Sequence, residues 1–285
     1  MFETWDHTKL QEPFVLSLVG GRKQGKSVSM TQLVLQTSEQ FDLIISFCGN
    51  KFCQPALTAI MEKGFDDRFF FESWNANLIE RLLNQQTRLL EEGNPRKVLI
   101  VMDDCVLTAR DSEQLAHLAM RGRHFGLSLM TASVSYTAIN KRVRRSLDYL
   151  FVFSCPMMGD MKVLSFEYTQ SMNTAVFGLK NLEDHQCMIM ETCKKQQILY
   201  TWKSILITPE MIQSEPSLES ARQRILPRYS KTRQRKTLSS CSPKKSRGAP
   251  SLSLEQNTPC GPLPADKSVS EDLPSSPLSN ENLRI

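Results

Sequence analysis

Long hydrophobic runs are missing from this chain of 285 residues. No stretch approaches the roughly 18 consecutive apolar residues of a membrane-spanning helix, so we expect no membrane span. The first residues, MFETWDHTKLQEP, lack the basic start and apolar stretch of a secretory signal, and we expect the protein to stay in a reducing compartment. The eight cysteines include no CxxC pair. We interpret them as reduced thiols rather than as a disulfide framework or a zinc site.

Aromatic residues are nearly absent from the end of the chain. Tyr229 is the only one after Trp202, whereas eight of the 14 prolines lie in 227–285. Such a segment buries too little apolar surface to offset its ordering entropy, which predicts that residues 215–285 are disordered. Within them, 222–247 contains ten basic residues and no acidic one. This pattern favours a nuclear-import signal or a nucleic-acid contact, and a solvating tail is the alternative.

Residues 1–214 alternate short apolar runs with helical patterns. The runs are rich in Val, Ile, Leu and Phe, as is typical of strands buried on both faces. They predict strands at 14–19, 42–48, 68–72, 97–103, 126–132 and 149–154. Helices are predicted at 27–38, 76–92, 112–121 and from near Val134 to about Arg145. The alternation predicts one α/β domain with a mostly parallel sheet and helices on both faces. Near its end, QCMIMET and QILYTWK predict a terminal β-hairpin.

The strongest motif follows the first predicted strand, where GGRKQGKS fits the Walker A pattern G-x-x-x-x-G-K-[ST]. Its residues are Gly20, Gly21, Arg22, Lys23, Gln24, Gly25, Lys26 and Ser27. The backbone N–H groups of such a loop, with the N-terminus of the following helix, form an anion site, and its glycines allow close approach of the phosphates. We predict that Lys26 contacts the β- and γ-phosphates of ATP and that the Ser27 hydroxyl ligates Mg²⁺.

An acidic pair, Asp103 and Asp104, ends the predicted strand VLIVMDD. Ligands in parallel α/β sheets bind at the carboxyl ends of the strands, so this pair is expected beside the Walker A loop. Asp103 is predicted to hold Mg²⁺. Asp104 stands where ATPases of the additional-strand class usually carry a catalytic Glu, and we expect it to polarise the attacking water. Because Asp is one methylene shorter than Glu, that water would sit closer.

Arginines cluster in two segments behind these motifs. An arginine finger stabilises charge on a nucleotide bound by a neighbouring subunit, and any of these side chains could serve as one. For each of them, a surface or DNA-facing role is the alternative. The candidates are Arg121, Arg123, Arg142, Arg144 and Arg145.

Residues 12–205 resemble the FtsK–HerA superfamily of pumping ATPases. The resemblance is closest to the genome-packaging ATPases of poxviruses and of their large-DNA-virus and Polinton or adintovirus-like relatives. It rests on GGRKQGKS, VLIVMDDC, RGRHFGLSLMTAS and YTAINKRVRRSLDYLFVF. The resemblance implies a P-loop NTPase of the additional-strand, RecA-like class that uses ATP and Mg²⁺ to move double-stranded DNA into a capsid. It further implies a homo-oligomeric ring, expected to be a hexamer, and a capsid or portal component as partner.

The same resemblance ranks the arginines and locates the departures from the family. Arg123 is the first candidate for the finger and Arg144 the second. The family places a sensor Gln at the end of the strand after Walker B, where this chain has Thr131-Ala132-Ser133. With the basic tail, it also predicts localisation in the host nucleus, or otherwise at a cytoplasmic assembly site or in the virion.

Three other functions fit the motifs. One is a DNA pump or helicase-like motor that does not package genomes, and another is a nucleotide-gated DNA-binding adaptor that binds ATP without turnover. The third is a nucleoside-type P-loop kinase. Such kinases usually place the Walker B strand beside the first strand, whereas this chain has extra predicted strands between the two motifs. ATPase activity stimulated by DNA favours a motor, and phosphoryl transfer to a nucleoside favours a kinase.

Overall fold

A computed structural model describes residues 3–49, 52, 54–154, 157–169, 172–192 and 199–223. These residues contain a nine-stranded sheet in the order β1-β9-β8-β7-β2-β6-β5-β3-β4. Its strands are β1 (Glu3–Thr4), β2 (Val15–Val19), β3 (Leu43–Cys48), β4 (Phe70–Phe71), β5 (Val98–Asp103), β6 (Leu127–Ser133), β7 (Tyr149–Val152), β8 (Gln186–Glu191) and β9 (Leu199–Lys203). Neighbouring strands are parallel except that β8 runs antiparallel to both β7 and β9, which confirms the predicted hairpin.

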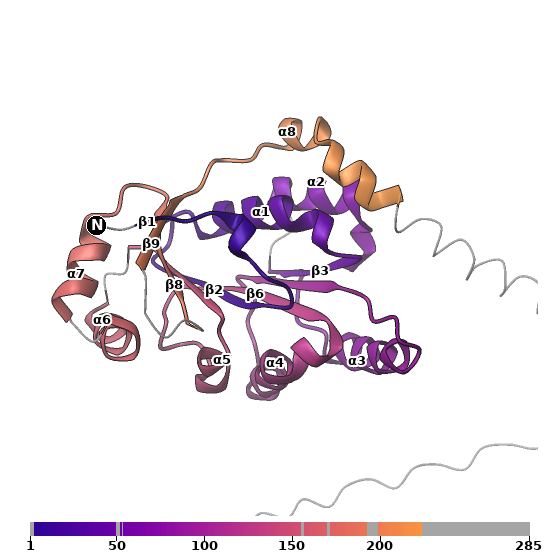
Figure 1. Ribbon diagram of the computed structural model, residues 1–285, viewed down its shortest axis with the longest axis horizontal. Helices are drawn as coiled ribbons and strands as arrows, with labels where there is room; N and C mark the ends of the chain where they lie inside the picture. The colour runs from indigo at the N-terminus through magenta and orange to yellow at the C-terminus, as the bar shows by residue number, and fades with distance from the viewer. Residues whose placement is uncertain are drawn as a thin grey trace, which may run out of the picture. The chain divides into compact units, whose positions relative to one another are not determined.

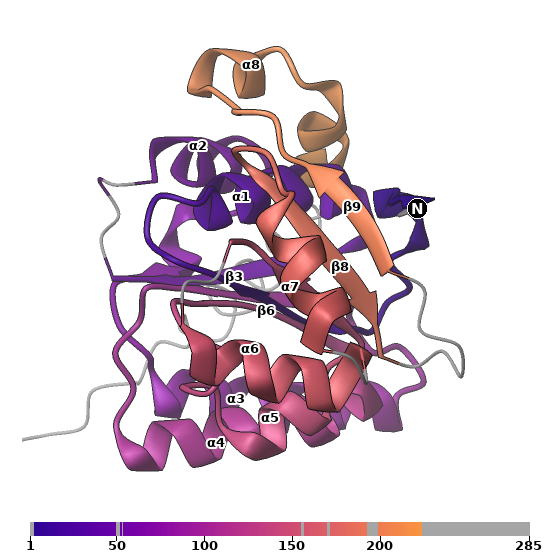
Figure 2. The same cartoon turned by 90° about the vertical axis from the view of Figure 1, so that its left-hand side faces the viewer.

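Helices cover both faces of this sheet. Figures 1 and 2 show α1, α2 and α8 on one face and α3, α4 and α5 on the other. The helices are α1 (Lys26–Thr37), α2 (Pro55–Gly64), α3 (Ala76–Glu91), α4 (Ala109–Arg121), α5 (Lys141–Arg145), α6 (Met158–Leu164), α7 (Met172–Lys180) and α8 (Pro209–Gln213). No helix in the described part of the chain is both long enough and apolar enough to span a membrane.

The apolar side chains of the central strands alternate between two buried clusters. Leu16 and Leu18 of β2 pack in the cluster that contains Met30 of α1, whereas Val15 and Val19 belong to the cluster on the opposite face. Because successive side chains of a strand point to opposite faces, a strand covered by helices on both sides must be apolar throughout. The predicted α/β class with helices on both faces is therefore confirmed.

The strand β6 lies between β2, which leads into the Walker A loop, and β5, which ends in the acidic pair. This is the arrangement expected of the additional-strand class. The β-strands predicted at 14–19, 42–48, 97–103 and 126–132 are all present, with bounds that differ by one residue at most at each end. The strand predicted at 68–72 is shorter, since only Phe70 and Phe71 pair with β3.

The helix predicted from Val134 to Arg145 is wrong in its first half. Only Lys141–Arg145 are helical, and residues 134–140 form a loop. The carboxylate of Asp160 in α6 accepts hydrogen bonds from the backbone N–H groups of Tyr136 (3.1 Å) and Thr137 (3.0 Å). It also accepts from the hydroxyls of Ser135 and Thr137. These tertiary hydrogen bonds give the backbone of the loop an alternative to helical hydrogen bonds, and they override the local helical pattern.

The folded part of the chain extends beyond the predicted start of the tail. Residues 216–223 form a helix in which Leu218 and Ala221 are fully buried. The ammonium group of Lys63 in α2 donates to the carbonyl of Glu215 at 2.9 Å. The prediction of disorder is thus wrong for 215–223. Residues 224–285, which include most of the basic segment 222–247, lie outside the described residues.

Candidate nucleotide site

The Walker A loop connects β2 to α1 and is anchored to the ends of both strands that flank β2. The N–H of Gly20 donates to the carbonyl of Ser133 at the end of β6, and the N–H of Gly21 donates to that of Ser154 beyond β7, both at 3.2 Å. The ammonium group of Lys26 turns back and donates to the carbonyls of Gly20 (2.9 Å) and Gly21 (2.7 Å). The lysine therefore closes the loop on itself at the carboxyl edge of the sheet.

Two glycines of the loop are required by its geometry. Gly25 has φ +94°, and a Cβ atom there would come within 2.6 Å of the Nδ1 atom of His185. A Cβ atom on Gly20 would lie 2.6 Å from the Cβ of Phe153. An L-residue with a side chain fits neither position without displacing its neighbours. The loop before β8, which contributes His185, thus packs directly against the Walker A loop.

The carboxylate of Asp103 joins the two motifs. Asp103 is 4% exposed and accepts hydrogen bonds from the side chains of Ser27 and Gln54. Burial raises the pKa of Asp103, and these two hydrogen bonds counteract the shift in part. Burial also lowers the pKa of Lys26, against the opposing attraction of Asp103 and Asp104. The buried carboxylate of Asp103 is suited to a cation, and the half-buried ammonium group of Lys26 is suited to negatively charged phosphates.

Asp104 differs from its neighbour in exposure and backbone conformation. Its side chain is exposed, and its φ of +51° is unusual for a residue other than glycine. The carbonyl of Asp104 lies against Gly49, where a Cβ atom would approach it to 2.5 Å. The strand end thus turns sharply after Asp103, which leaves Asp103 buried beside Ser27 and turns Asp104 toward solvent.

A cleft of about 530 Å³ lies over these residues. It is lined by Arg22, Lys23, Lys26, Ser27, Asp103, Asp104, Cys105, Ala132, Ser133 and Val134. Cationic side chains from the Walker A loop share it with the two carboxylates from the end of β5. The Ser27 hydroxyl and the Asp103 carboxylate are hard oxygen donors of the kind that Mg²⁺ prefers, and Mg²⁺ is commonly held by one or two carboxylates together with substrate phosphates. The residues present therefore fit the predicted cation.

The two sensor candidates on β6 differ in position. The Thr131 hydroxyl lies 2.6 Å from that of Ser17 in β2, and its side chain is buried. Ser133 lines the cleft, and its hydroxyl donates to the carbonyl of Ser135 at 2.9 Å. Of the two, Ser133 is thus the side chain that can contact a nucleotide.

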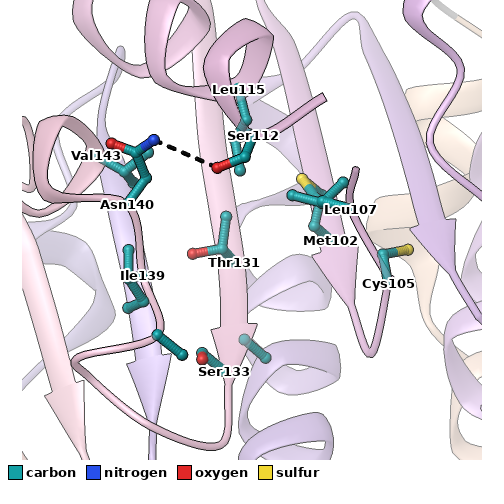
Figure 3. A pocket seen from close by; sticks show the side chains of 12 residues that line it. Met102, Cys105, Leu107, Ser112, Leu115, Thr131, Ser133, Ile139, Asn140 and Val143 are labelled. Atoms are coloured by element: carbon teal, nitrogen blue, oxygen red, sulfur yellow. Dashed lines mark hydrogen bonds between the residues drawn. The ribbon is translucent and has the colours of Figure 1, made fainter. Parts of the chain in front are cut away.

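A second pocket of about 320 Å³ adjoins the cleft and shares Cys105, Ala132 and Ser133 with it. Figure 3 shows Thr131 and Ser133 of β6 facing this pocket, with the hydrogen bond between Asn140 and Ser112 across one side of it. Apolar side chains from β5, α4 and the loop before α5 supply most of the remaining lining.

The two arginine-finger candidates lie away from the Walker residues. Arg123 precedes β6 and pairs with Asp148 at 3.4 Å, and Asp148 in turn accepts from the N–H of Val15, the first residue of β2. Arg123 is therefore at the amino edge of the sheet, about 20 Å from the carboxyl edge for a strand of this length. Arg144 pairs with Glu167 at 3.3 Å and lies over the ring of Tyr136. At that distance Arg123 cannot reach a nucleotide held by its own Walker A loop.

Two residues near the Walker motifs, Gln54 and His185, were not predicted from the sequence. Gln54 lies six residues beyond Cys48, the end of β3, and Cys48 is in register with Asp103. A polar side chain after the carboxyl end of the neighbouring strand is a signal that could have indicated Gln54. His185 carries no such signal, because its contact with Gly25 joins segments about 160 residues apart that only the sheet order brings together.

A family model described as poxvirus A32 protein matches residues 3–212. The chain belongs to the poxvirus A32 protein family. The match confirms the family predicted from the motifs, and with it the assignment of the chain as an ATPase of the viral packaging type. A comparison with curated protein sequences gave no match.

Solved structures show the same fold. The DNA-packaging ATPase B204 of Sulfolobus turreted icosahedral virus is similar over 69% of this chain and 100% of that chain, with 15% identity and a TM-score of 0.50. The pCW3 conjugation coupling protein TcpA, in its monomer form with ATPγS, is similar over 78% of this chain and 74% of that chain, with 12% identity and a TM-score of 0.55. At such identities the likeness establishes the fold of this A32 family member, a P-loop ATPase with a mostly parallel sheet.

Proposed function

We propose that this protein is an ATP-hydrolysing motor that translocates double-stranded viral DNA into a capsid. The observation that carries the proposal is the juxtaposition of Ser27 and Asp103, which brings the Walker A and Walker B motifs together in one cleft. Membership of the poxvirus A32 family supports the biological context. The printed descriptions of the similar structures, a DNA-packaging ATPase and a conjugation coupling protein with ATPγS, agree with a nucleotide-driven motor on DNA.

The side chains of the cleft divide the work of hydrolysis. The ammonium group of Lys26, now held by two loop carbonyls, exchanges these for the β- and γ-phosphates of ATP. The loop N–H groups and the N-terminus of α1 bind the same phosphates. Asp104, which is exposed in the cleft beside the buried Asp103, orients the attacking water and accepts its proton.

Ser27 and Asp103 would hold Mg²⁺. When bound, the ion would supply positive charge to offset the charge that develops on the phosphate oxygens. Burial raises the pKa of Asp103, and a bound cation would offset this cost of burying its charge.

Assembly into a ring gives the distant arginines a function. Arg123 and Arg144 line a single cleft of about 470 Å³ together with Lys141 and Arg145. Arg123 enters this cleft from the amino edge of the sheet, so its guanidinium group would act on a nucleotide held by another copy. We propose a homo-oligomeric ring, a hexamer by family resemblance, in which Arg123 is the finger and Arg144 the second candidate. A capsid or portal component is the expected partner, and the basic segment 222–247 is the expected signal for entry into the host nucleus.

The sheet order disfavours the kinase alternative. In this chain β6 separates β2 from β5, whereas nucleoside-type kinases usually place the Walker B strand next to the first strand. The other two alternatives, a DNA pump that does not package genomes and a nucleotide-gated adaptor, would have the same Walker geometry. Experiment is needed to distinguish them from the packaging motor.

The test measures ATP hydrolysis by the full-length protein with and without linear double-stranded DNA, and images the protein with ATPγS and DNA. A packaging motor is expected to hydrolyse ATP faster with DNA, to form rings, and to bind empty capsids of its own virus. Turnover that is independent of DNA together with phosphorylation of a nucleoside would refute the motor. ATP binding without turnover in all conditions would leave the adaptor instead.

A further inference from the structure

A glutamine contacts the Walker B carboxylate from the segment after β3, on the side of β5 opposite to the expected sensor strand β6. The side-chain Nε2 of Gln54, the residue before α2, donates to Oδ2 of Asp103. Gln54 follows β3, which lies on one side of β5, whereas the expected sensor position is on β6, on the other side. Gln54 is 8% exposed, so its amide is held inside the protein beside the carboxylate.

The other end of the same amide has no hydrogen-bond partner in the part of the chain that the structure describes. Oε1 of Gln54 is buried and accepts no hydrogen bond from any described residue. An ionised carboxylate can only accept, so the amide must present its N–H to Asp103 and turn its oxygen elsewhere. A buried carbonyl oxygen without a donor is destabilising, and such groups call for an explanation when they occur in a native protein. The contact with Asp103 provides one, because it holds the amide in this orientation.

The residues on β6 do not fill the sensor role in the same way. The hydroxyl of Thr131 is engaged with Ser17, and that of Ser133 donates to a carbonyl of its own loop. Both hydroxyls are thus engaged elsewhere, whereas the amide of Gln54 contacts Asp103 directly.

We propose that Gln54 is a positioning residue for the Walker B carboxylate. Its N–H fixes Oδ2 of Asp103 and so orients the carboxylate that would hold Mg²⁺. The inference rests on the proposed function, since it assigns Gln54 to the Mg²⁺–nucleotide site. Partners that orient a metal-binding carboxylate in this way typically change metal affinity by about 10–100-fold when removed.

The test is calorimetric binding of ATPγS to the full-length protein over a series of Mg²⁺ concentrations and in excess EDTA. In Gln54→Ala, the Mg²⁺ concentration for half-maximal enhancement of ATPγS affinity should rise about tenfold, with the affinity in EDTA unchanged within about twofold. Gln54→Glu keeps the size of the side chain but replaces the donor by a second acid, so it should show an equal or larger shift. A merely structural role would change melting temperature without moving this Mg²⁺ dependence.

Gln86→Ala is the matched control. Gln86 is another buried glutamine, whose amide donates to the carbonyls of Arg96 (2.6 Å) and Phe125 (2.9 Å), near the amino ends of β5 and β6. It should lose stability and retain the wild-type Mg²⁺ dependence. A wild-type Mg²⁺ dependence in Gln54→Glu, or in a folded Gln54→Ala, would overturn the proposal. Absence of ATPγS binding by the wild type would instead overturn the proposed function, and the inference with it.

Discussion

Leu218 provides a direct test of where the folded domain ends. The side chain is fully buried, and it packs so closely on α2 that a Cβ atom on Gly64 would lie 2.7 Å from its Cδ2. Leu218→Ala removes this contact without changing a charge or a hydrogen bond. If 216–223 is an integral part of the core, the substitution should destabilise the whole domain.

The size of the effect follows from burial. Leucine-to-alanine substitutions in protein cores cost about 2–5 kcal/mol, depending on how far the site can collapse. The helix that carries Leu218 is the last described element, so it can partly close the cavity, and we expect about 2–3 kcal/mol. For a domain of this size, such a loss lowers the melting temperature by roughly 4–12 °C. Leu206→Ala is the matched control, because Leu206 is 65% exposed and its truncation should change stability by no more than about 0.5 kcal/mol.

The assay is thermal unfolding of the full-length wild type and both variants, followed by circular dichroism, with urea unfolding as a second measure. The Leu218 variant should melt several degrees below the Leu206 variant, with an unchanged slope against urea. Equal melting temperatures in the two variants would show that 216–223 does not stabilise the domain, and the boundary would return to residue 214.

Four further outcomes are expected. Gly25→Ala, at φ +94°, should weaken ATPγS binding at least tenfold in calorimetry. A second substitution, His185→Ala, removes the imidazole that the new methyl group meets and should recover only part of this loss, because a backbone strain of about 1–2 kcal/mol remains. Asp104→Asn should bind ATPγS and Mg²⁺ as the wild type does yet hydrolyse almost no ATP; equal turnover would remove its role in orienting water. Arg123→Ala should bind ATP but lose about three orders of magnitude or more in turnover, and mixing it with Lys26→Ala subunits should restore some activity; no recovery in confirmed mixed rings would favour Arg144 or exclude a shared site. A chain that ends at residue 223 should stay folded and bind DNA with a shallower dependence on salt, and an unchanged salt slope would reduce the tail to a solvating extension.

Much of the fold and site was predictable because it depends on local patterns. Strands buried on both faces need apolar side chains at every position, so the runs at 14–19 and 97–103 locate β2 and β5 directly. A loop that wraps phosphates needs glycines at fixed spacing before a lysine and a hydroxyl residue, so GGRKQGKS can be identified as a Walker A loop from its spacing alone. In parallel sheets, loops and acids at the carboxyl ends of strands meet at one edge, which brings Ser27 and Asp103 together.

Other features depended on contacts between distant segments. Asp160 holds residues 135–137 out of the predicted helix by accepting their hydrogen bonds. The helix 216–223 precedes a segment whose composition predicts disorder, and tertiary contacts such as that of Leu218 with α2 distinguish the helix from it. Local propensity cannot predict such partners, because the stabilising free energy comes from burial and hydrogen bonds that form only when the chain is folded.

By itself, the sequence determined the strands, the Walker loop and the acidic pair, since each is encoded by spacing within a few neighbouring residues. Tertiary structure decided the roles that depend on position. It buried Asp103 and exposed Asp104, placed Arg123 at the edge opposite the Walker A loop, and brought Gln54 from the segment after β3 to the Walker B carboxylate. The physical reason is the sheet order, in which β6 lies between β2 and β5, and β3 lies on the far side of β5. This order determines which side chains meet at one edge of the sheet, and no local pattern specifies it.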